Sequence, residues 1–346
     1  MSVRIAVDTM GGDLGPREII SGVMQYLSNH ASDDTEIVLV GRQHELASLL
    51  ADLKPQSSRI MIKNATDVIT MDSPPTDGIR KKESSLVISH GLLKRGEVAA
   101  VISTGNTGAV MASAIFNLGR LDGVSRPAIA TLFPTASDKP CLVLDVGANS
   151  DCKVHNLIEF AHMGSIYYSY MYDNKSPRLA LLSIGEERTK GNDVTIETHR
   201  QLTDNSLNFV GNIEGRDVLK GQADVVVCDG FVGNIILKFA ESIKSFIFDK
   251  FKAQVSANVF SRAGAALMAP FLRRLKKTFD YAEYGGAPLL GINGVTIICH
   301  GASNARAVSN AIKMAREMVI RRVNEHIGKE LAGMKKAVRL KGNGSE

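Results

Sequence analysis

One pattern recurs along most of the chain: a short apolar, β-branched run ends in a Gly-rich or polar turn, and an amphipathic helical pattern usually follows. Continuous apolar strands that alternate with helices are typical of a mostly parallel sheet covered by helices on both faces. The pattern therefore predicts an α/β fold. The clearest predicted strands are residues 5–7, 99–102, 142–144, 179–182, 225–227 and 295–298.

Polar turns follow these strands, and open α/β sheets bind ligands outside the carboxyl ends of their strands. The polar turns therefore mark where we expect the ligand site.

The chain has 346 residues, 44% of them apolar, which is enough for a large buried core and excludes a disordered chain or a disulfide-stapled miniprotein. It has no Trp and only 5% aromatic residues, which argues against a stacking surface for nucleic acid. The net charge of +5 suits an anionic ligand.

The cysteines and the N-terminus predict a cytoplasmic protein. None of the four cysteines forms a C-x-x-C pair, so reduced, buried thiols are the favoured interpretation. The N-terminus lacks the pattern of a signal peptide, and no run of about 18 residues is long and apolar enough to predict a spanning helix.

One turn after a predicted strand suits an anion. Its small residues allow a tight bend, and the free N–H groups and positive dipole end of the following helix attract negative charge. The turn matches neither a Walker loop nor a G-x-G-x-x-G fingerprint, so an ordinary strand-to-helix turn stays open as the alternative. Its residues are Ser103, Thr104, Gly105, Asn106, Thr107 and Gly108.

Three consecutive cations, Arg80, Lys81 and Lys82, precede a helical pattern. Cations at a helix start oppose the helix dipole, and a bound anion would offset that cost. A solvated basic turn is the alternative.

Other strand ends carry titratable side chains. Glu187, Lys190 and Asn192 lie in a dense polar loop, for which a salt-bridged helix start is the alternative. Asp229 could position a cation or a donor, or could cap a helix. His300 could contact a ligand or be structural.

The sequence has no G-x-S-x-G nucleophile elbow and no zinc or EF-hand spacing. Many anion donors without a nucleophile or a metal site favour transfer chemistry in which the substrate brings its own nucleophile, such as inorganic phosphate. We therefore expect no metal and no cofactor.

Residues 243–277 carry an apolar stripe at helical spacing, which we expect to break near Gly264 and at Pro270. Their net charge is +7, more than the +5 of the whole chain. This predicts either core helices with a solvated basic face or a projecting helical pair that contacts an anionic membrane or an acidic protein. The contact residues would be Leu267, Phe271, Arg273, Arg274, Lys276 and Lys277.

Seven segments together resemble the bacterial phosphate acyltransferases of phospholipid synthesis, the PlsX-type acyl-acyl-carrier-protein:phosphate transacylases. They occur in family order and span nearly the whole chain. The segments are residues 6–13, 102–109, 126–129, 144–149, 185–187 with 190–192, 229–234 and 285–291.

The resemblance implies a three-layer α/β/α sandwich of two intertwined lobes, similar to phosphotransacetylases and isocitrate-type dehydrogenases. Residues 1–332 would form a single catalytic unit and 333–346 a flexible basic tail. The resemblance also implies a homodimer that reversibly transfers a fatty acyl group from acyl-carrier protein to inorganic phosphate. It would visit the membrane peripherally and reversibly, where a membrane-bound glycerol-3-phosphate acyltransferase uses the acyl-phosphate.

The mechanism is a hypothesis. The turn from Ser103 to Gly108 would hold phosphate, with Lys81 or Lys82 neutralising charge, and no acyl-enzyme would form. Asn106, Asn192 or Lys190 would stabilise the tetrahedral oxyanion, and His300 would protonate the departing thiol. Asp229 would orient neighbouring donors, and Asn149, Glu187 and Asn234 are further candidate substrate contacts.

Three other functions remain open. A phosphotransacetylase acting on short acyl-coenzyme A would share the fold and the chemistry. A metal- and nicotinamide-dependent dehydrogenase would need convergent acids, for which Asp145, Asp151 and Asp229 are the candidates. A non-enzymatic scaffold would bind phosphate without turnover.

Overall fold

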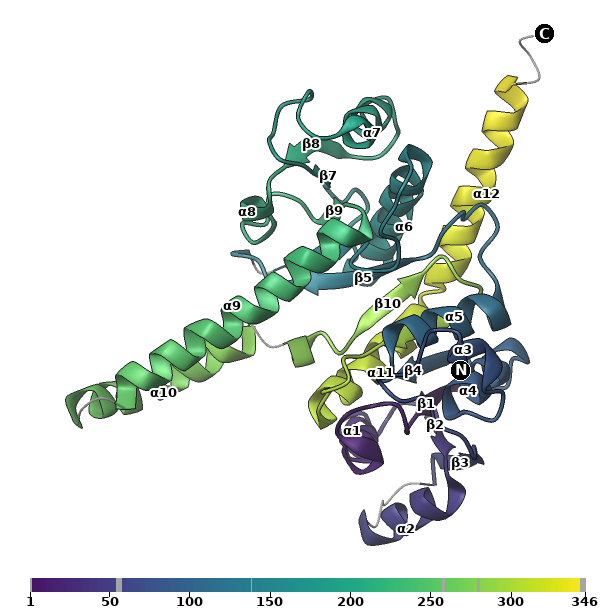
Figure 1. Ribbon diagram of the computed structural model, residues 1–346, viewed down its shortest axis with the longest axis vertical. Coiled ribbons are helices and arrows are strands. Elements are labelled where there is room, and N and C mark those ends of the chain that lie inside the picture. The colour runs from purple at the N-terminus through teal and green to yellow at the C-terminus, as the bar shows by residue number, and fades with distance from the viewer. Residues whose placement is uncertain (1, 54–57, 138, 257–258, 279–280, 343–346) are drawn as a thin grey trace.

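The computed structural model describes residues 2–53, 58–137, 139–256, 259–278 and 281–342. Within these ranges the centre of the molecule is an eleven-stranded sheet of order β3-β2-β1-β4-β11-β10-β5-β6-β9-β7-β8 (Figure 1). All six strands singled out in the sequence are confirmed. The strands are β1 (Val3–Asp8), β2 (Thr35–Gly41), β3 (Ile60–Asn64), β4 (Ala100–Ser103), β5 (Ala128–Phe133), β6 (Cys141–Leu144), β7 (Leu179–Leu182), β8 (Phe209–Ile213), β9 (Val225–Val227), β10 (Ala287–Leu290) and β11 (Val295–Ile298).

The sheet is mostly parallel, but its direction changes at the centre. Strands β3, β2, β1, β4 and β11 are parallel to one another, as are β6, β9, β7 and β8. Between the two sets, β10 pairs antiparallel with β11 and β5, and β5 pairs antiparallel with β6. The carboxyl ends of β1, β4 and β11 therefore belong to one edge of the sheet, and those of β6, β7 and β9 belong to the opposite edge.

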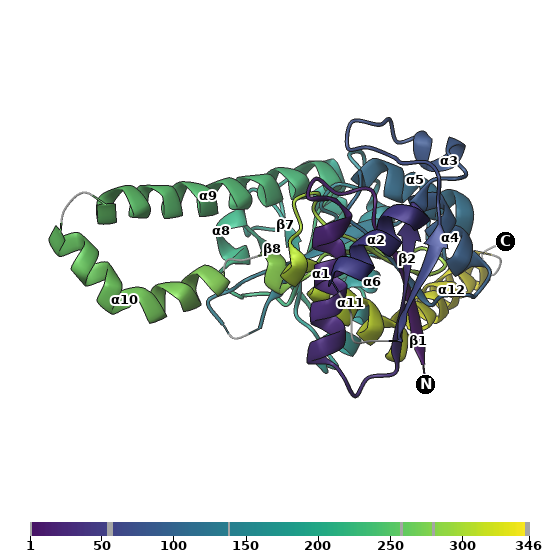
Figure 2. The same ribbon diagram turned by 90° about the horizontal axis from the view of Figure 1, so that it is seen from below.

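Helices cover both faces of the sheet, which confirms the three-layer α/β/α prediction (Figure 2). One face packs against α1, α6, α7, α11 and α12, and the other against α4, α5 and α9. The helices are α1 (Gly15–Asn29), α2 (Gln43–Leu53), α3 (Asp77–Arg80), α4 (Ser85–Lys94), α5 (Thr107–Leu118), α6 (Val154–Tyr172), α7 (Asp193–Thr203), α8 (Gly215–Val218), α9 (Gly230–Ser256), α10 (Val259–Thr278), α11 (Ala305–Ile320) and α12 (Val323–Gly342), with a short 3-10 helix at Tyr281–Glu283.

Alternation along the strands explains the two apolar layers. On β1, Ile5 and Val7 belong to the apolar cluster that includes Val23 of α1, whereas Ala6 faces the cluster that includes Leu92 of α4. Successive side chains of a strand point to opposite faces, so a strand that is covered on both sides is apolar throughout. Fully burying a side chain such as Ile5 contributes about 2 kcal/mol to folding.

Helices α9 and α10 form a pair that extends away from the sheet (Figures 1 and 2). The expected break at Pro270 does not occur, because this proline and Gly264 both lie inside α10. A proline within a helix removes one backbone hydrogen bond and bends the axis, and α10 is visibly bent in Figure 2. The neighbouring Ala, Leu and Met residues are strong helix formers that keep the helix continuous.

Helix α12 continues to Gly342, through most of the segment in which the sequence predicted a flexible tail. Ile327 and Leu331 are buried and fasten the first half of this helix to the core. The residues that follow include Met, Lys, Ala, Arg and Leu, which favour helix, so the helix propagates beyond its buried part. Residues 343–346 of the predicted tail lie outside the described residues.

Candidate active site

Three loops meet at the carboxyl ends of β1, β4 and β11, where glycines allow their backbones to approach closely. A Cβ atom at Gly11 would lie 2.7 Å from the Gly105 Cα atom. A Cβ atom at Gly12 would lie 2.4 Å from Thr104 Oγ1 and 3.3 Å from the carbonyl oxygen of Gly301. Larger residues would push these loops apart. We call Gly11, Gly12, Gly105 and Gly301 the glycine cradle.

Asp8 anchors the cradle from the end of β1. Its buried carboxylate accepts hydrogen bonds from Ser85 Oγ at 2.6 Å, Ser103 Oγ at 2.7 Å and the Met10 N–H at 3.2 Å. Burial raises the pKa of Asp8, and these hydrogen bonds oppose the rise. Ser103 Oγ also accepts a hydrogen bond from the Gly105 N–H at 3.1 Å. Ser103, a predicted phosphate contact, thus uses its hydroxyl to organise the loop.

The remainder of the predicted phosphate loop begins helix α5, as expected. Asn106 caps the helix, because its Oδ1 accepts a hydrogen bond from the Ala109 N–H at 2.9 Å. Its Nδ2 donates to backbone carbonyls of residues 71 and 73. Both ends of the Asn106 amide are therefore engaged in structural bonds rather than open to an oxyanion. Thr107 and Gly108 lie in the first turn of α5.

Thr104 differs from its neighbours. Its side chain is only 2% exposed, and its hydroxyl has no hydrogen-bond partner among the described residues. A buried polar group without a partner costs about 1–3 kcal/mol, so such a group points to a water or a ligand that completes it. Thr104 precedes Asn106, the N-cap residue of α5, by two residues, and the backbone N–H groups and dipole of a helix N-terminus favour negative charge. This part of the molecule is suited to an anion.

The three predicted cations lie between two helices, at the end of α3 and just before α4, which begins at Ser85 as the sequence predicted. Helix α3 ends at Arg80, and Lys81 is its C-cap residue. Positive charge is favourable at the carboxyl end of α3, so these cations do not by themselves call for a bound anion. Lys81 Nζ pairs with Asp77 at 3.3 Å and donates to the Val68 carbonyl at 3.1 Å, while Lys82 is exposed.

A second polar group forms around Asp145, at the carboxyl end of β6. The Asp145 Oδ1 atom accepts hydrogen bonds from the N–H groups of Ile129, Gly147 and Ala148 at 2.9–3.1 Å. Its Oδ2 atom accepts two from Asn149, from the backbone N–H at 2.7 Å and from Nδ2 at 2.8 Å. Burial raises the pKa of Asp145, and the hydrogen bonds oppose the rise. Asp145 thus fixes the loop that carries Asn149.

Asp229 and Asn234 belong to this second group. Asp229 Oδ1 accepts a hydrogen bond from the Val232 N–H at 2.8 Å in the first turn of α9, which is the capping role left open by the sequence. Asn234 lies beside the Asp145 loop, since a Cβ atom at Gly147 would be 3.6 Å from Asn234 Oδ1.

The loop after β7 carries the other three predicted residues. Glu187 and Lys190 both border Gly185, whose Cβ would lie 2.8 Å from Glu187 Oε2 and 2.9 Å from Lys190 Cγ. Asn192 caps α7 by accepting a hydrogen bond from the Thr195 N–H at 2.8 Å, which leaves its Nδ2 for another partner.

The predicted site residues thus fall into two groups, and no contact recorded among the described residues joins them. The cradle group holds Ser103–Gly108 and His300, and Lys81 and Lys82 lie on the loop between α3 and α4. The Asp145 group holds Asn149, Asp229 and Asn234, and we include in it Glu187, Lys190 and Asn192, which follow β7 at the same edge of the sheet. The reversal of strand direction at β10 and β5 separates them. A sequence pattern reports that a strand ends in a polar turn, but not which way that strand runs in the sheet.

His300 follows β11 in the cradle group and is exposed. Its Nδ1 accepts a hydrogen bond from the Ala302 N–H at 3.1 Å. In the neutral ring the proton is then on Nε2. Sequence reasoning overlooked Asp8 as an anchor of this group, although it directly follows a predicted strand.

The four cysteines are free and buried, as predicted. Among the residues that the structure describes, no cluster of His, Cys, Asp or Glu could hold a metal ion. In the same part of the chain no helix has the length and apolar character required to cross a membrane.

The chain is similar to a known family over nearly its whole length. A family model described as fatty acid synthesis protein matches residues 3–326. A phosphate acyltransferase from Moorella thermoacetica is 51% identical over 314 residues, covering 90% of this chain and 91% of the relative. A phosphate acyltransferase from Heliobacterium modesticaldum is 47% identical over 333 residues, covering 94% of this chain and 98% of the relative.

The fold also matches a solved structure. A phosphotransacetylase from Streptococcus pyogenes superimposes with a TM-score of 0.60 at 15% identity, covering 92% of this chain and 94% of that one. This likeness confirms the predicted fold. The family resemblance drawn from the seven segments is also confirmed, and the chain belongs to the fatty acid synthesis protein family together with these phosphate acyltransferases.

Proposed function

We propose that this protein is a phosphate acyltransferase that moves a fatty acyl group from an acyl-carrier-protein thioester to inorganic phosphate. The observation that carries the proposal is the glycine cradle, where the buried Thr104 hydroxyl has no partner among the described residues and Thr104 precedes the Asn106 N-cap of α5 by two residues. The similarity to phosphate acyltransferases over more than 90% of the chain supports the same function.

The chemistry needs positioning more than activation. Phosphate at neutral pH is already an anionic oxygen nucleophile. Binding it next to the thioester converts a bimolecular reaction into an effectively unimolecular one. Its oxygen attacks the thioester carbonyl, the new O–C bond forms, and the C–S bond breaks when the tetrahedral intermediate collapses. The products are acyl-phosphate and a thiolate that takes up a proton.

Residues of the cradle group would hold phosphate. Thr104 and Thr107 would offer hydroxyl donors, and the first backbone N–H groups of α5 would supply the remainder. Lys81 or Lys82 would neutralise charge from the preceding loop. His300 would protonate the leaving thiolate, because it follows β11 in the cradle group and its side chain is exposed.

The Asp145 group would contact the acyl donor. Its candidate contacts are Asn149, Glu187 and Asn234, and Asp229 would hold the N-terminus of α9 in place. Lys190 and Asn192, which the sequence proposed as oxyanion donors, follow β7 at the opposite edge of the sheet and are proposed as further contacts to the acyl donor. The oxyanion forms on the carbon that bonds to phosphate, so its donors would come from the cradle group, where one backbone N–H of α5 could contribute about 3 kcal/mol.

The reaction is tested with purified protein, an acyl-carrier-protein thioester and inorganic phosphate. We expect acyl-phosphate that hydroxylamine converts to a hydroxamate, and no product when phosphate is omitted. Acetyl-coenzyme A in the same assay separates this function from a short-chain phosphotransacetylase, and reduction of NAD(P) would favour the dehydrogenase. Phosphate binding without turnover would indicate a scaffold, and an acylated Ser or Cys trapped in a single turnover would contradict the direct attack.

The helical pair α9–α10 supports proposals about partners. Phe231, Ile235 and Phe239 on α9 are more than half exposed, which suits a second copy of the chain in a homodimer. Leu267 and Phe271 on α10 are also more than half exposed, in a segment of strong positive charge. This suits a peripheral, reversible contact with an anionic membrane, where a membrane-bound glycerol-3-phosphate acyltransferase would consume the product, and contact with acidic acyl-carrier protein.

Arg274 also lies on α10, whereas the side chains of Arg273, Lys276 and Lys277 are outside the described part of the structure. The proposed location is the cytoplasm and its membrane surface. Nucleic acid is not a proposed partner.

A further inference from the structure

A second buried hydroxyl lies at the edge that carries the glycine cradle. Ser303 is 2% exposed, and its Oγ atom has no hydrogen-bond partner among the described residues, as is the case for Thr104. Unsatisfied buried hydroxyls are uncommon, because each lacks the hydrogen bonds that water gave it. The Thr104 and Ser303 hydroxyls lie on adjacent loops, so one bound ligand could supply the missing hydrogen bonds of both.

The topology brings these two loops together. Thr104 follows β4 and Ser303 follows β11, and these parallel neighbours are in register, with Ser103 opposite Ile298. The register continues past the strands, because the Cys299 N–H donates to the Ser103 carbonyl at 2.8 Å.

The loop from β1 lies between the other two. The position of a Gly12 Cβ is 2.4 Å from Thr104 Oγ1 and 3.3 Å from the Gly301 carbonyl. The Asp13 N–H donates to that same carbonyl at 2.9 Å. Ser303 is two residues beyond Gly301, and its N–H turns back to the His300 carbonyl at 2.9 Å.

Both hydroxyls precede long helices whose N-termini favour an anion. Helix α5 has 12 residues and α11 has 16, and each is capped by the side chain of an asparagine. Carboxylates border the same region: Glu18 Oε1 accepts the Ala305 N–H at 2.7 Å, and Asp13 is exposed beside Gly301. The Glu18 carboxylate thus takes one N–H at the N-terminus of α11, so an anion beside both hydroxyls would use backbone N–H groups of α5.

We infer that Ser303 is a further phosphate-binding residue, which acts with Thr104 so that a hydroxyl from each neighbouring strand end donates to the same phosphate. The inference rests on the proposed function for its substrate. In the sequence Ser303 is only one residue in a polar turn. That its hydroxyl is buried without a hydrogen-bond partner among the described residues is visible only in the folded structure.

The test compares Ser303→Ala and Thr104→Ala with Ser165→Ala. Ser165, on α6, is a matched control because its hydroxyl is also buried without a partner but lies outside the cradle group. Without phosphate, Ser303→Ala and Ser165→Ala should melt at or above the temperature of the wild type, because removing an unsatisfied hydroxyl relieves a desolvation cost. Thr104→Ala also loses a buried methyl group, and this loss lowers the melting temperature and offsets that gain. With inorganic phosphate as the only ligand, Ser303→Ala and Thr104→Ala should weaken binding by calorimetry about tenfold, whereas Ser165→Ala should bind as the wild type does.

Kinetics supply the second readout. The KM for phosphate should rise in Ser303→Ala, whereas the KM for the acyl donor should not. Unchanged phosphate affinity and KM in Ser303→Ala would overturn the inference while leaving the proposed function intact. Ser303-dependent phosphate binding in a protein without acyl transfer would support the inference and reject the proposed function. A melting temperature lowered in Ser303→Ala alone would also overturn it, because it would show a structural partner.

Discussion

At the scale of single residues, glycines set how closely the loops and helices approach. Gly233, in the first turn of α9, lies so near the Asp145 backbone that a Cβ atom would be 1.9 Å from its carbonyl oxygen. Gly264, in α10, has nothing within 4 Å of the same position. The two glycines occupy similar helical backbone but have opposite surroundings, so their substitutions should have opposite effects.

We expect Gly233→Ala to destabilise the protein by about 1–3 kcal/mol or more, because a backbone atom cannot yield as a side chain does. Gly264→Ala should stabilise it by about 0.5–1 kcal/mol, because alanine costs less conformational entropy in a helix. Urea unfolding of the two variants measures both changes in the free energy of unfolding. Equal changes in the free energy of unfolding would contradict the contact argument.

The sequence singled out candidate site residues, and the structure shows which structural roles several of them have. Asp229 and Asn192 were proposed for chemistry, and both cap helices in the structure. Capping is a common role for Asp and Asn after a strand, so the sequence favours neither role. The roles of Ser103 and Thr104 diverge because Asp8, from a distant part of the sequence, engages one hydroxyl and leaves the other without a partner.

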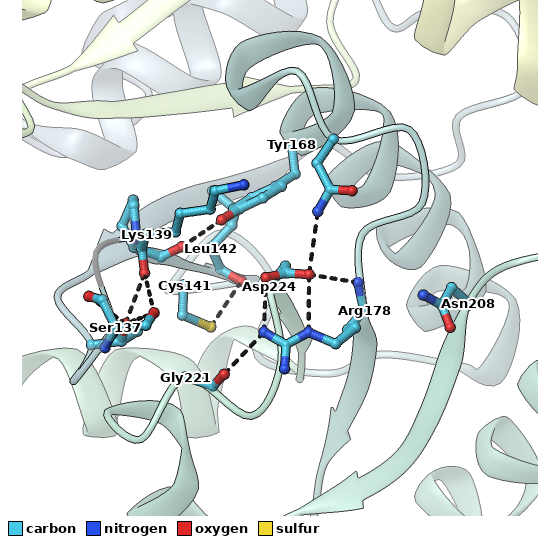
Figure 3. A network of polar contacts seen from close by, with 12 residues as sticks. Ser137, Lys139, Cys141, Leu142, Tyr168, Arg178, Asn208, Gly221 and Asp224 are labelled. Atoms are coloured by element: carbon cyan, nitrogen blue, oxygen red, sulfur yellow. Dashed lines mark hydrogen bonds and ion pairs between the residues drawn. The ribbon is translucent and has the colours of Figure 1, made fainter.

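At the scale of elements, an ion pair joins the amino ends of β7 and β9, away from the Asp145 group. Arg178 Nη2 and Nε donate to the two carboxylate oxygens of Asp224 at 3.0 and 3.2 Å, and the Arg178 N–H donates to the same carboxylate at 2.8 Å (Figure 3). Arg178 Nη2 also donates to the Gly221 carbonyl at 3.0 Å. Burial alone would raise the pKa of Asp224, but the hydrogen bonds from Arg178 outweigh it and lower the pKa.

The lowered pKa fixes the sign of a pH effect. Ionised Asp224 stabilises the folded state above the pKa of the unfolded chain, near 4, and this stabilisation is lost as pH falls through the lower folded pKa. Asp224→Asn should therefore cost about 1–3 kcal/mol near neutral pH, and the difference from the wild type should shrink in acid.

Urea unfolding of Asp224→Asn and of the wild type, at neutral and at acidic pH, measures this difference in the free energy of unfolding. Asp204→Asn is the control, because Asp204 is exposed at the end of α7. A difference between Asp224→Asn and wild type that stays constant down to strongly acidic pH would contradict the role of the charge.

At the scale of the whole molecule, the helical pair exposes large apolar side chains on both of its helices. Phe239 on α9 is 65% exposed and Leu267 on α10 is 85% exposed. Exposed apolar side chains of this size mark contacts with proteins or membranes. If α9 serves the second copy and α10 the membrane, one substitution on each helix should separate the two contacts.

We expect Phe239→Asp to sediment as a monomer where the wild type sediments as a dimer. Leu267→Asp should remain dimeric but float less with vesicles of anionic phospholipid, because a carboxylate replaces apolar area and is repelled by the lipid. Each variant serves as the control for the other. If each variant lost both dimer formation and vesicle binding, a single surface would make both contacts.

The sequence by itself determined the strands, the fold class and the family, because continuous apolar runs and their polar turns are local properties that β-sheet burial imposes. It also located the polar turns from which the candidate sites are built. Only the tertiary structure decided how those turns are grouped, because strand direction depends on pairing between distant segments and reverses at β10 and β5. Packing also decided which hydroxyls lack a partner, as at Thr104 and Ser303, because hydrogen bonds to side chains such as Asp8 form only between segments that the fold brings together.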